Sequence, residues 1–230
     1  MYASKTESHL WAVCVHGYRG TIANTKCYGM NYSRMGYNVL LPENRTGGQS
    51  EGTYIGMGWL DKNDLMLWVK KIISVDEKAE IVLHGESMGA ATVLMLSGDN
   101  PPEAVKCIVA DCGYTSVWDE FSHVMKSSMH MPVFPLLYFS SFISKFQLGY
   151  GFREASAKKQ MAKSKLPTLF LHGEDDTFVP TFMSGLNFTA LNAPKELKLF
   201  PHARHCESEF YDPDLYWQTV SGFLQKHVGL

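Results

Sequence analysis

The stretch that decides the fold is "IVLHGESMGAATVLML", residues 81–96. It begins as a short apolar run typical of a buried strand and ends as an apolar run typical of a buried helix. Between them stands Gly85-Glu86-Ser87-Met88-Gly89, a serine flanked by glycines. In that setting the serine occupies a tight turn, and its hydroxyl projects beside the first amides of the helix. We interpret Ser87 as a nucleophile. The alternative is a serine that only caps the helix, with glycines needed for packing.

Composition places the chain among ordinary globular proteins. Its 230 residues are 45% hydrophobic and 19% charged, which predicts one domain with a full core. A net charge of −2 provides no basic field, so no nucleic-acid partner is expected. The five cysteines are odd in number, lack a CxxC pair, and are expected to be reduced and packed as small hydrophobes. They are Cys14, Cys27, Cys107, Cys112 and Cys206.

No membrane span is predicted. Residues 1–10 lack the apolar core of a signal peptide. The uncharged stretch 127–144, 18 residues long, is interrupted by Pro132 and Pro135 and is rich in serine. We therefore expect a cytoplasmic protein from the sequence as written.

Short apolar runs alternate with helical patterns along most of the chain. Strands are expected near 10–17, 38–42, 80–85, 106–113, 168–174 and 196–201. Helices are expected near 22–34, 60–75, 88–97, from about 180, and 213–227. Apolar strands that alternate with helices indicate a parallel sheet covered on both faces.

The helix expected over 60–75 illustrates how the buried faces are predicted. Leu65, Trp68, Ile72 and Val75 recur at helical spacing and are expected to form its buried stripe. Asp61 is expected to cap its first turn.

The segment 114–165 does not follow the alternation. It is rich in Met, Phe, Leu, Ser and Pro, and a connection of that length usually has its own structure. We divide the chain into a core part (1–113), a helical cap (114–165) and the rest of the same core (166–230). The cap is expected to lie over the carboxyl edge of the sheet, where open α/β sheets bind ligands. Its large residues could line an apolar substrate pocket, or they could simply pack the cap onto the body. These residues are Trp118, Phe134, Leu137 and Phe142.

A nucleophilic serine needs a base and an acid that orients the base. Asp175 and Asp176 follow the strand at 168–174, and His202 and His205 follow the strand at 196–201. These positions bring candidate acids and bases to the edge of the sheet that carries Ser87. We favour His205 as the base, because it comes with the two partners, whereas His202 alone is better explained as a surface-loop residue.

An oxyanion site would complete the chemistry. "VHGYRG" (15–20) follows the first strand, and backbone amides near Tyr18 could join the Met88 amide in binding a tetrahedral oxyanion. The Tyr18 ring either shapes an acyl pocket or simply packs.

Five stretches together resemble the α/β-hydrolase superfamily, in order and across essentially the whole chain. They are "HGYRG", "PENRTGGQSEG", "HGESMG", "LHGEDDTFVP" and "HARH". The finer likeness is to bacterial serine hydrolases of the esterase/lipase-like or serine-aminopeptidase-like group. The resemblance implies a catalytic triad of Ser87, Asp176 and His205, with Arg45 fixing a loop. Asp176 matches the pattern because Val179 and Pro180 stand in register with it.

The resemblance also implies a three-layer α/β-hydrolase fold with a small helical cap. The first two strands of the family's eight have no counterpart here, so a mostly or wholly parallel sheet of about six strands is expected, ordered 2-1-3-4-5-6. The strand at 38–42 would then be an edge strand. Relatives often carry an N-terminal hydrophobic anchor, so the alternative to the cytoplasm is a membrane-anchored or cell-surface location, if the sequence has lost an N-terminal segment.

These observations predict a carboxylesterase acting on small to medium acyl or aryl esters through an acyl-enzyme. Thioester hydrolysis, acyl transfer and peptide cleavage use the same triad and stay open. A non-catalytic protein that binds an apolar ligand is the remaining alternative. No metal or organic cofactor is expected, the partner is a small-molecule ester, and the state is a monomer or weak dimer.

Overall fold

The computed structural model describes residues 8–228 and contains one sheet of six parallel strands. Its order is β2-β1-β3-β4-β5-β6, which confirms the predicted order and direction. The strands are β1 (Leu10–Val15), β2 (Asn38–Leu40), β3 (Glu80–Glu86), β4 (Val105–Asp111), β5 (Thr168–Gly173) and β6 (Lys195–Phe200).

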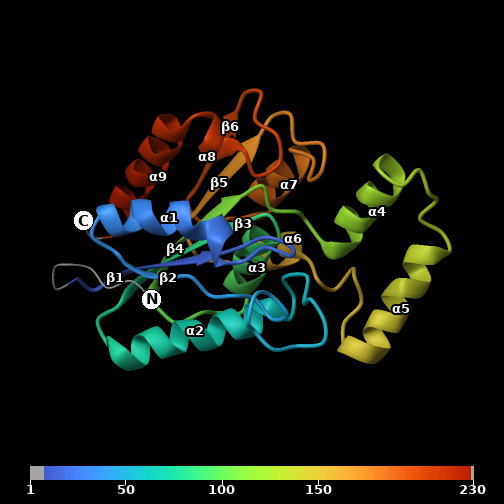
Figure 1. The fold of residues 1–230 in the computed structure, drawn as a ribbon, viewed down its shortest axis with the longest axis horizontal. Coiled ribbons are helices and arrows are strands. Elements are labelled where there is room, and N and C mark those ends of the chain that lie inside the picture. Colours follow the sequence, from blue (N-terminus) through green and yellow to red (C-terminus); the bar gives the residue numbers. More distant parts are fainter. Residues whose placement is uncertain (1–7, 229–230) are drawn as a thin grey trace.

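Helices connect the strands and flank the sheet (Figure 1). They are α1 (Ile22–Arg34), α2 (Asp61–Val75), α3 (Met88–Ser97), α4 (Val117–Ser127), α5 (Leu136–Leu148), α6 (Ala157–Met161), α7 (Phe182–Ala190), α8 (Ser208–Tyr211) and α9 (Pro213–His227). The bounds predicted for α1, α3 and α9 are confirmed. The sequence analysis missed α8, because a single turn is too short to give a periodic pattern.

The core has two layers because strand side chains alternate between the two faces of the sheet. In β1, Val13 and Val15 belong to the cluster beneath α2, α3, α6 and α7. Ala12 and Cys14 belong to the cluster beneath α1 and α9. Both faces are therefore apolar, which explains why the strands read as continuous hydrophobic runs.

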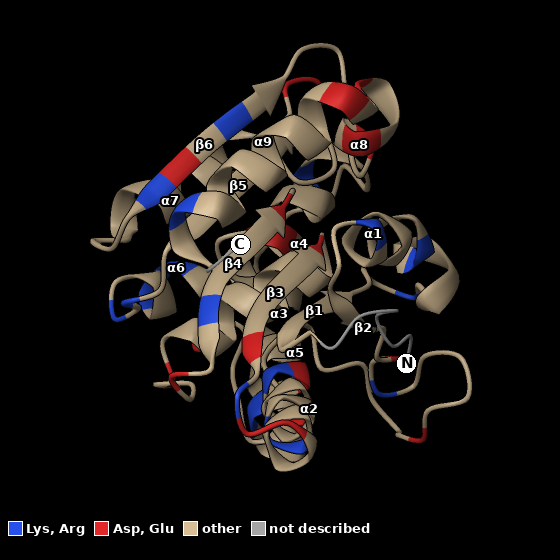
Figure 2. Cartoon of the chain, turned by 90° about the vertical axis from the view of Figure 1, so that its left-hand side faces the viewer, with Lys and Arg blue, Asp and Glu red and all other residues tan. Residues whose placement is uncertain are grey.

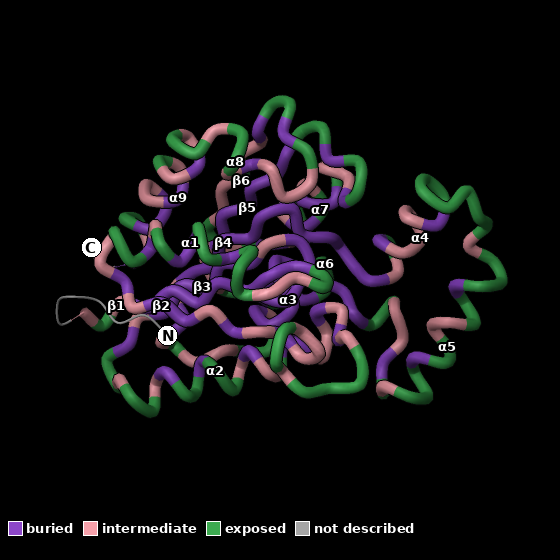
Figure 3. The backbone as a smooth tube through the Cα atoms, in the orientation of Figure 1, coloured by how far each residue is buried: buried purple, intermediate pink, exposed green. Residues whose placement is uncertain are grey.

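Helix α3, which begins directly after Ser87, is buried along its whole length. Each of its residues from Met88 to Ser97 is buried, and the helix packs against the sheet, α2 and α6 (Figure 3). A helix enclosed on all sides has no polar face, so its sequence is apolar throughout.

The predicted stripe of α2 is half wrong. Leu65 and Ile72 are buried as expected, but the third buried apolar residue is Val69. Trp68 is 40% exposed and Val75 is 58% exposed. Both lie on one flank of the buried stripe, roughly 65–90° from its centre at 100° per residue. Size and hydrophobicity favoured Trp68 in the sequence, whereas the orientation of the helix on the sheet selects Val69.

The predicted cap of α2 is also wrong. Asp61 is the first residue of the helix, and Leu60 stands at the capping position without a side-chain hydrogen bond. The Asp61 carboxylate instead accepts a hydrogen bond from the Gly58 amide at 2.7 Å. It therefore fixes the turn before the helix.

The segment 114–165 contains three helices with different surroundings. Helices α4 and α5 stand together at one end of the molecule, and most of their residues are exposed or half-buried (Figures 1 and 3). Helix α6 packs on α3, and its Ala157 and Met161 belong to the core. The division into 1–113, 114–165 and 166–230 stays a prediction.

Both sheet edges carry features that discourage pairing with other chains. The predicted edge strand β2 is only three residues long. The other edge, β6, carries Lys195, Glu196 and Lys198, and opposite charges are interspersed elsewhere (Figure 2). Within residues 8–228, no helix combines the length and apolarity needed to cross a membrane.

The corrected stripe of α2 predicts different costs for two truncations. Ile72→Ala removes a fully buried side chain and should lower the free energy of unfolding by about 2–5 kcal/mol. Val75→Ala, on the exposed flank, should change it by about 0.5 kcal/mol or less. Urea denaturation followed by circular dichroism measures both. Equal losses in the two variants would contradict this placement of α2.

Candidate active site

Three predicted residues lie at the carboxyl edge of the sheet. Ser87 follows β3, Asp176 lies beyond β5, and His205 lies beyond β6. Because all strands are parallel, these loops emerge at the same edge. The sheet therefore brings together residues that are far apart in the sequence.

Ser87 sits on a strained turn between β3 and α3. Its φ of 55° lies in the left-handed region, which residues other than glycine seldom adopt. A Cβ at Gly85 would collide with the Gly89 backbone, and a Cβ at Gly89 would collide with the Val15 backbone. The Ser87 amide donates to the Asp111 carbonyl at 2.9 Å. The two glycines are thus required by close backbone approach.

Ser87, His205 and Asp176 form a continuous hydrogen-bonded chain. The Ser87 Oγ lies 2.8 Å from His205 Nε2. On the other side of the ring, His205 Nδ1 lies 2.7 Å from Asp176 Oδ2. The carboxylate accepts from Nδ1–H, so Nε2 of the neutral ring is free to accept the serine proton.

Asp176 is held in its ionised form. Its Oδ1 accepts hydrogen bonds from the amides of Phe178 and Val179, both at 2.9 Å. Burial alone would raise the pKa of Asp176, but its hydrogen bonds with His172 and His205 lower the pKa to about 2. The carboxylate is therefore charged over the whole neutral range.

The sequence analysis missed His172, which positions Asp176. This buried side chain lies in β5, and its Nε2 is 3.1 Å from Asp176 Oδ2 and 2.8 Å from the Val179 carbonyl oxygen. Both partners are acceptors, so Nε2 carries the hydrogen. Its Nδ1 lies 2.6 Å from Ser184 Oγ. A histidine inside the apolar run "TLFLHG" was the available signal, because a buried ring needs polar partners.

The surroundings of His205 shift its pKa in opposite directions. Burial favours the neutral ring and would lower the pKa of His205, whereas Cys112 and the Asp176 carboxylate favour imidazolium and raise it. The net effect raises the pKa of His205 above its ordinary value. The charged ring is thus the form that the Asp176 carboxylate stabilises.

The alternative pair lies on the surface. His202 Nδ1 is 3.8 Å from Asp175 Oδ2, and both side chains are largely exposed. Of the four candidate acids and bases, only Asp176 and His205 make the chain of hydrogen bonds that reaches Ser87.

A second buried hydrogen-bond network supports the sheet behind the turn at Ser87. The Tyr32 hydroxyl lies 3.1 Å from His84 Nδ1, and His84 Nε2 lies 3.0 Å from the Tyr216 hydroxyl. The Tyr216 hydroxyl donates to the Asp111 carboxylate at 3.1 Å. Burial raises the pKa of Asp111 to about 6. This network joins α1, β3, β4 and α9, and the sequence analysis did not predict it.

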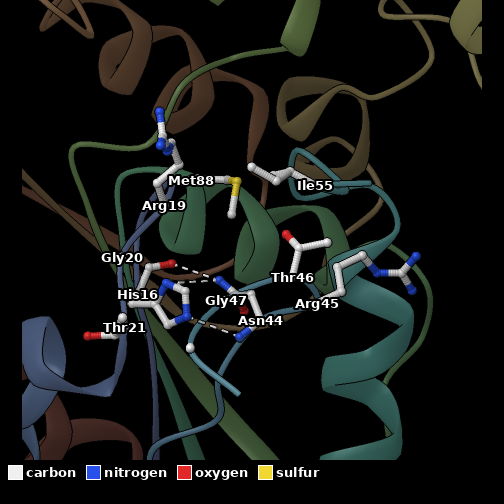
Figure 4. A pocket seen from close by; sticks show the side chains of 11 residues that line it. His16, Arg19, Gly20, Thr21, Asn44, Arg45, Thr46, Gly47, Ile55 and Met88 are labelled. Atoms are coloured by element: carbon white, nitrogen blue, oxygen red, sulfur yellow. Dashed lines mark hydrogen bonds between the residues drawn. The ribbon is translucent and has the colours of Figure 1, made fainter. Parts of the chain in front are cut away.

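The loop after β1 is fixed beside Ser87. In Figure 4 the His16 ring stands against Asn44. The Asn44 amide donates to His16 Nε2 at 3.0 Å, and the Asn44 side chain donates to the His16 carbonyl at 3.0 Å. Gly20 closes the following turn by donating to the Gly17 carbonyl at 3.2 Å. A cavity of about 200 Å³ lies between these loops.

The two predicted oxyanion residues border one cavity together with Ser87. Met88 is the first residue of α3, where an amide has no acceptor within the helix. Tyr18 lies in the fixed turn after β1, with its side chain exposed. The oxyanion role of these two amides stays a prediction.

Arg45 lies apart from the Ser87–His205–Asp176 chain. Its guanidinium donates two hydrogen bonds of 2.8 Å to the Asp64 carboxylate. A bidentate pair of this kind ties the loop after β2 to α2.

The cavity beside Ser87 measures about 420 Å³ and is mainly apolar. It lies against α4, α5 and the loop after β5. Its apolar lining residues are Met57, Met88, Phe121, Val124, Met125, Met129, Leu136, Leu137, Phe152, Phe178 and Val179.

Of the four predicted pocket residues, only Leu137 lines this cavity. Trp118 and Phe142 line a separate cavity, because the Trp118 ring turns to the flank of α4 and packs under Arg153, whose Cζ is 3.9 Å from the ring centroid. Phe134 is 71% exposed and contacts Tyr138. Aromatic size alone indicated these residues, and the orientation of the two helices decides otherwise.

All five cysteines are free thiols in the structure, but the predicted packing as small hydrophobes does not hold for Cys27. Cys14, Cys107 and Cys112 are buried, whereas Cys27 is exposed and Cys206 is half-buried. Cys112 Sγ lies 3.6 Å from Cys206 Sγ. Together with His205, these two thiols offer donor atoms within 4.8 Å of one another, a set that could hold a soft metal ion.

The Asp176 contact predicts how His205 titrates. In Asp176→Asn the imidazolium loses its carboxylate while burial still favours the neutral ring, so the pKa of His205 should fall. Long-range ¹H–¹⁵N NMR titration measures it. Asp175→Asn is the matched control, since this exposed neighbour does not contact His205. An unchanged pKa of His205 in Asp176→Asn would show that the carboxylate does not set the charge of the ring.

Comparisons with known proteins agree with this architecture. The chain is 29% identical over 217 residues to the uncharacterized protein YqkD of Bacillus subtilis, covering 92% of this chain and 70% of YqkD. It is 28% identical over 197 residues to the protein Bem46 of Schizosaccharomyces pombe, covering 85% of this chain but only 60% of Bem46.

Among solved structures, the esterase Pf2001 of Pyrococcus furiosus superimposes with a TM-score of 0.77 at 22% identity, covering 97% of this chain and 83% of the esterase. This likeness establishes the α/β-hydrolase fold. The model of the prolyl oligopeptidase family matches residues 26–230. The chain therefore belongs to the prolyl oligopeptidase family of serine hydrolases with the α/β-hydrolase fold.

Proposed function

We propose that this protein is a carboxylesterase that cleaves small to medium acyl or aryl esters through an acyl-enzyme. The observation that carries the proposal is the 2.8 Å contact between Ser87 Oγ and His205 Nε2, oriented by Asp176 at the mouth of an apolar cavity. An activated serine attacks an acyl carbon, and an apolar cavity accepts one end of the ester.

The geometry supports the following sequence of steps. His205 Nε2 takes the Ser87 proton as the oxygen attacks the ester carbonyl, and the Met88 and Tyr18 amides stabilise the oxyanion. The tetrahedral intermediate collapses, and His205 returns the proton to the departing alcohol. His205 then activates a water molecule, which releases the acid from Ser87. Asp176 stabilises the imidazolium at both stages.

Ester cleavage suits the lining of the cavity. Apolar side chains dominate it, so the end of the ester held there should itself be largely apolar. The short α4–α5 pair favours small to medium groups over long-chain triglycerides. The fold that this chain shares with the Pyrococcus furiosus esterase is consistent with the proposal.

Other reactions can use the same three residues. The family assignment favours cleavage of a peptide-like amide as the second candidate. Parallel assays of p-nitrophenyl esters, acyl-CoA thioesters and aminoacyl anilides separate esterase, thioesterase and peptidase chemistry. A non-catalytic binding protein has no use for a serine hydrogen-bonded to a histidine–aspartate pair.

Removing the nucleophile should abolish turnover. Ser87→Ala is expected to lower kcat for p-nitrophenyl butyrate by a factor on the order of 10⁶, because no acyl-enzyme forms. A fluorophosphonate probe should label the wild type at Ser87 and leave the variant unlabelled. Ser74→Ala, which changes an exposed serine on α2, is the control. Retained activity or labelling in Ser87→Ala would refute the proposal.

The two histidines after β6 should differ sharply. His205→Ala removes the base and should lower kcat/KM by about 10⁴-fold or more. His202→Ala removes an exposed ring and should change kcat/KM by about twofold or less. The same p-nitrophenyl butyrate assay measures both. The opposite ranking would transfer the role of base to His202.

A further inference from the structure

A buried carboxyl group on α4 has no hydrogen-bond partner among residues 8–228. Glu120 is 4% exposed, and both of its carboxyl oxygens are buried without a hydrogen bond to any described residue. Most buried polar groups are paired, because an unpaired one loses its bonds to water and gains nothing in return. Glu120 therefore requires an explanation.

Glu120 does not stabilise its own helix. The cap of α4 is Ser116, whose Oγ accepts from the Asp119 amide at 3.0 Å. The Asp119 carboxylate in turn accepts from the Thr115 and Ser116 hydroxyls, both at 2.7 Å. The Asp119 carboxylate thus stabilises the start of α4, and the Glu120 side chain takes no part in these hydrogen bonds.

Glu120 borders the cavity that also contains Ser87. No lysine, arginine or histidine and no second carboxyl group lines this cavity among the described residues. Two neighbouring hydroxyls have other partners, since Tyr114 donates to the Met57 carbonyl at 3.0 Å and Ser87 contacts His205. A molecule bound in this cavity is thus well placed to supply the hydrogen-bond partner that Glu120 lacks.

The carboxyl group is largely neutral near pH 7. Burial raises the pKa of Glu120 to about 8, while His205 opposes the shift and Asp176 adds to it. A protonated carboxyl group offers one O–H donor and one carbonyl acceptor. An alcohol or phenol hydroxyl matches this pair, because it can accept from the O–H group and donate to the carbonyl oxygen. No net charge is then buried, whereas an ammonium group would have to give up its hydration.

We propose that Glu120 is a specificity-determining residue that binds a hydroxyl group on the apolar end of the substrate ester. The inference rests on the proposed esterase function and narrows it to hydroxylated acyl or alkyl esters. A hydrogen-bonding group inside an apolar cavity discriminates strongly, since an analogue without the hydroxyl leaves Glu120 unpaired.

Matched substrates test the subsite. The acyl series pairs p-nitrophenyl hexanoate with its ω-hydroxy and ω-amino analogues, and longer acyl chains extend it. The alcohol series pairs hexyl acetate with ω-hydroxyhexyl acetate, so that either end of the ester can occupy the cavity. The readout is the preference ratio, kcat/KM of the hydroxy ester divided by that of its parent.

In at least one series the wild type should prefer the hydroxy ester, and Glu120→Leu should lower the preference ratio by about 10- to 100-fold. Glu120→Gln should keep most of the preference, because an amide also donates and accepts. Ser122→Ala is the matched control. It removes another unpartnered buried polar atom from α4 but does not line the cavity, so the ratio should stay unchanged.

Thermal unfolding separates recognition from a structural role. Replacing an unpaired buried carboxyl with Leu should leave Tm unchanged or raise it by about 2–4 °C. A structural role predicts a lower Tm and a preference ratio that does not move. Equal effects of Glu120→Leu on hydroxy and parent esters would overturn the proposal. A preference for the ω-amino ester that Glu120→Gln abolishes would overturn it in favour of an ammonium site.

A binding experiment stays informative if no ester is hydrolysed. In the Ser87→Ala variant, chemical shift titration compares hexan-1-ol with its methyl ether, which lacks the donor. Stronger binding of the alcohol that Glu120→Leu removes supports the subsite even where the esterase proposal fails. Equal binding of alcohol and ether would overturn the subsite independently of turnover.

Discussion

The close approach of α3 to β1 is the constraint on which the rest of the structure depends. The backbone of Gly89 touches that of Val15, and Gly85 touches Gly89, so no side chain fits at either position. This contact brings the start of α3 directly over the sheet and forces Ser87 into the left-handed region at φ 55°. The strain is sustained because the enclosed helix and the sheet hold both ends of the turn.

Two buried carboxyl groups beside that turn are held in opposite states. Asp176 accepts two backbone amides and faces two histidine rings, and these partners lower its pKa to about 2. Glu120 has no such partner within residues 8–228, and burial raises its pKa to about 8. Environments that separate the pKa values of two acids also separate their roles. One carboxylate orients the His205 ring, while the other remains a neutral group that faces the cavity.

The sequence was informative where a residue's role depends on its own strand or helix. Apolar runs located the strands, and positions just beyond strand ends brought Ser87, Asp176 and His205 to one edge. It was misleading where a role depends on how a helix is rotated, as with Trp68 on α2 and Trp118 on α4. It gave no warning of Glu120, since an acidic residue in the first turns of a helix ordinarily interacts with the helix dipole in water. Only the packing of α4 over the cavity makes it exceptional.

Substrate specificity is therefore expected to depend on α4 rather than on the turn at Ser87. That turn tolerates few substitutions, because backbone contacts leave no room for a side chain at Gly85 or Gly89. Helix α4 contributes Glu120, Phe121, Val124 and Met125 to the cavity, yet most of its other residues are exposed or half-buried. A substitution on its inner face alters the cavity without disturbing the sheet. Under the proposed esterase function, the same edge of the sheet can thus serve different esters, and Glu120 is expected to have the largest influence on which ester is accepted.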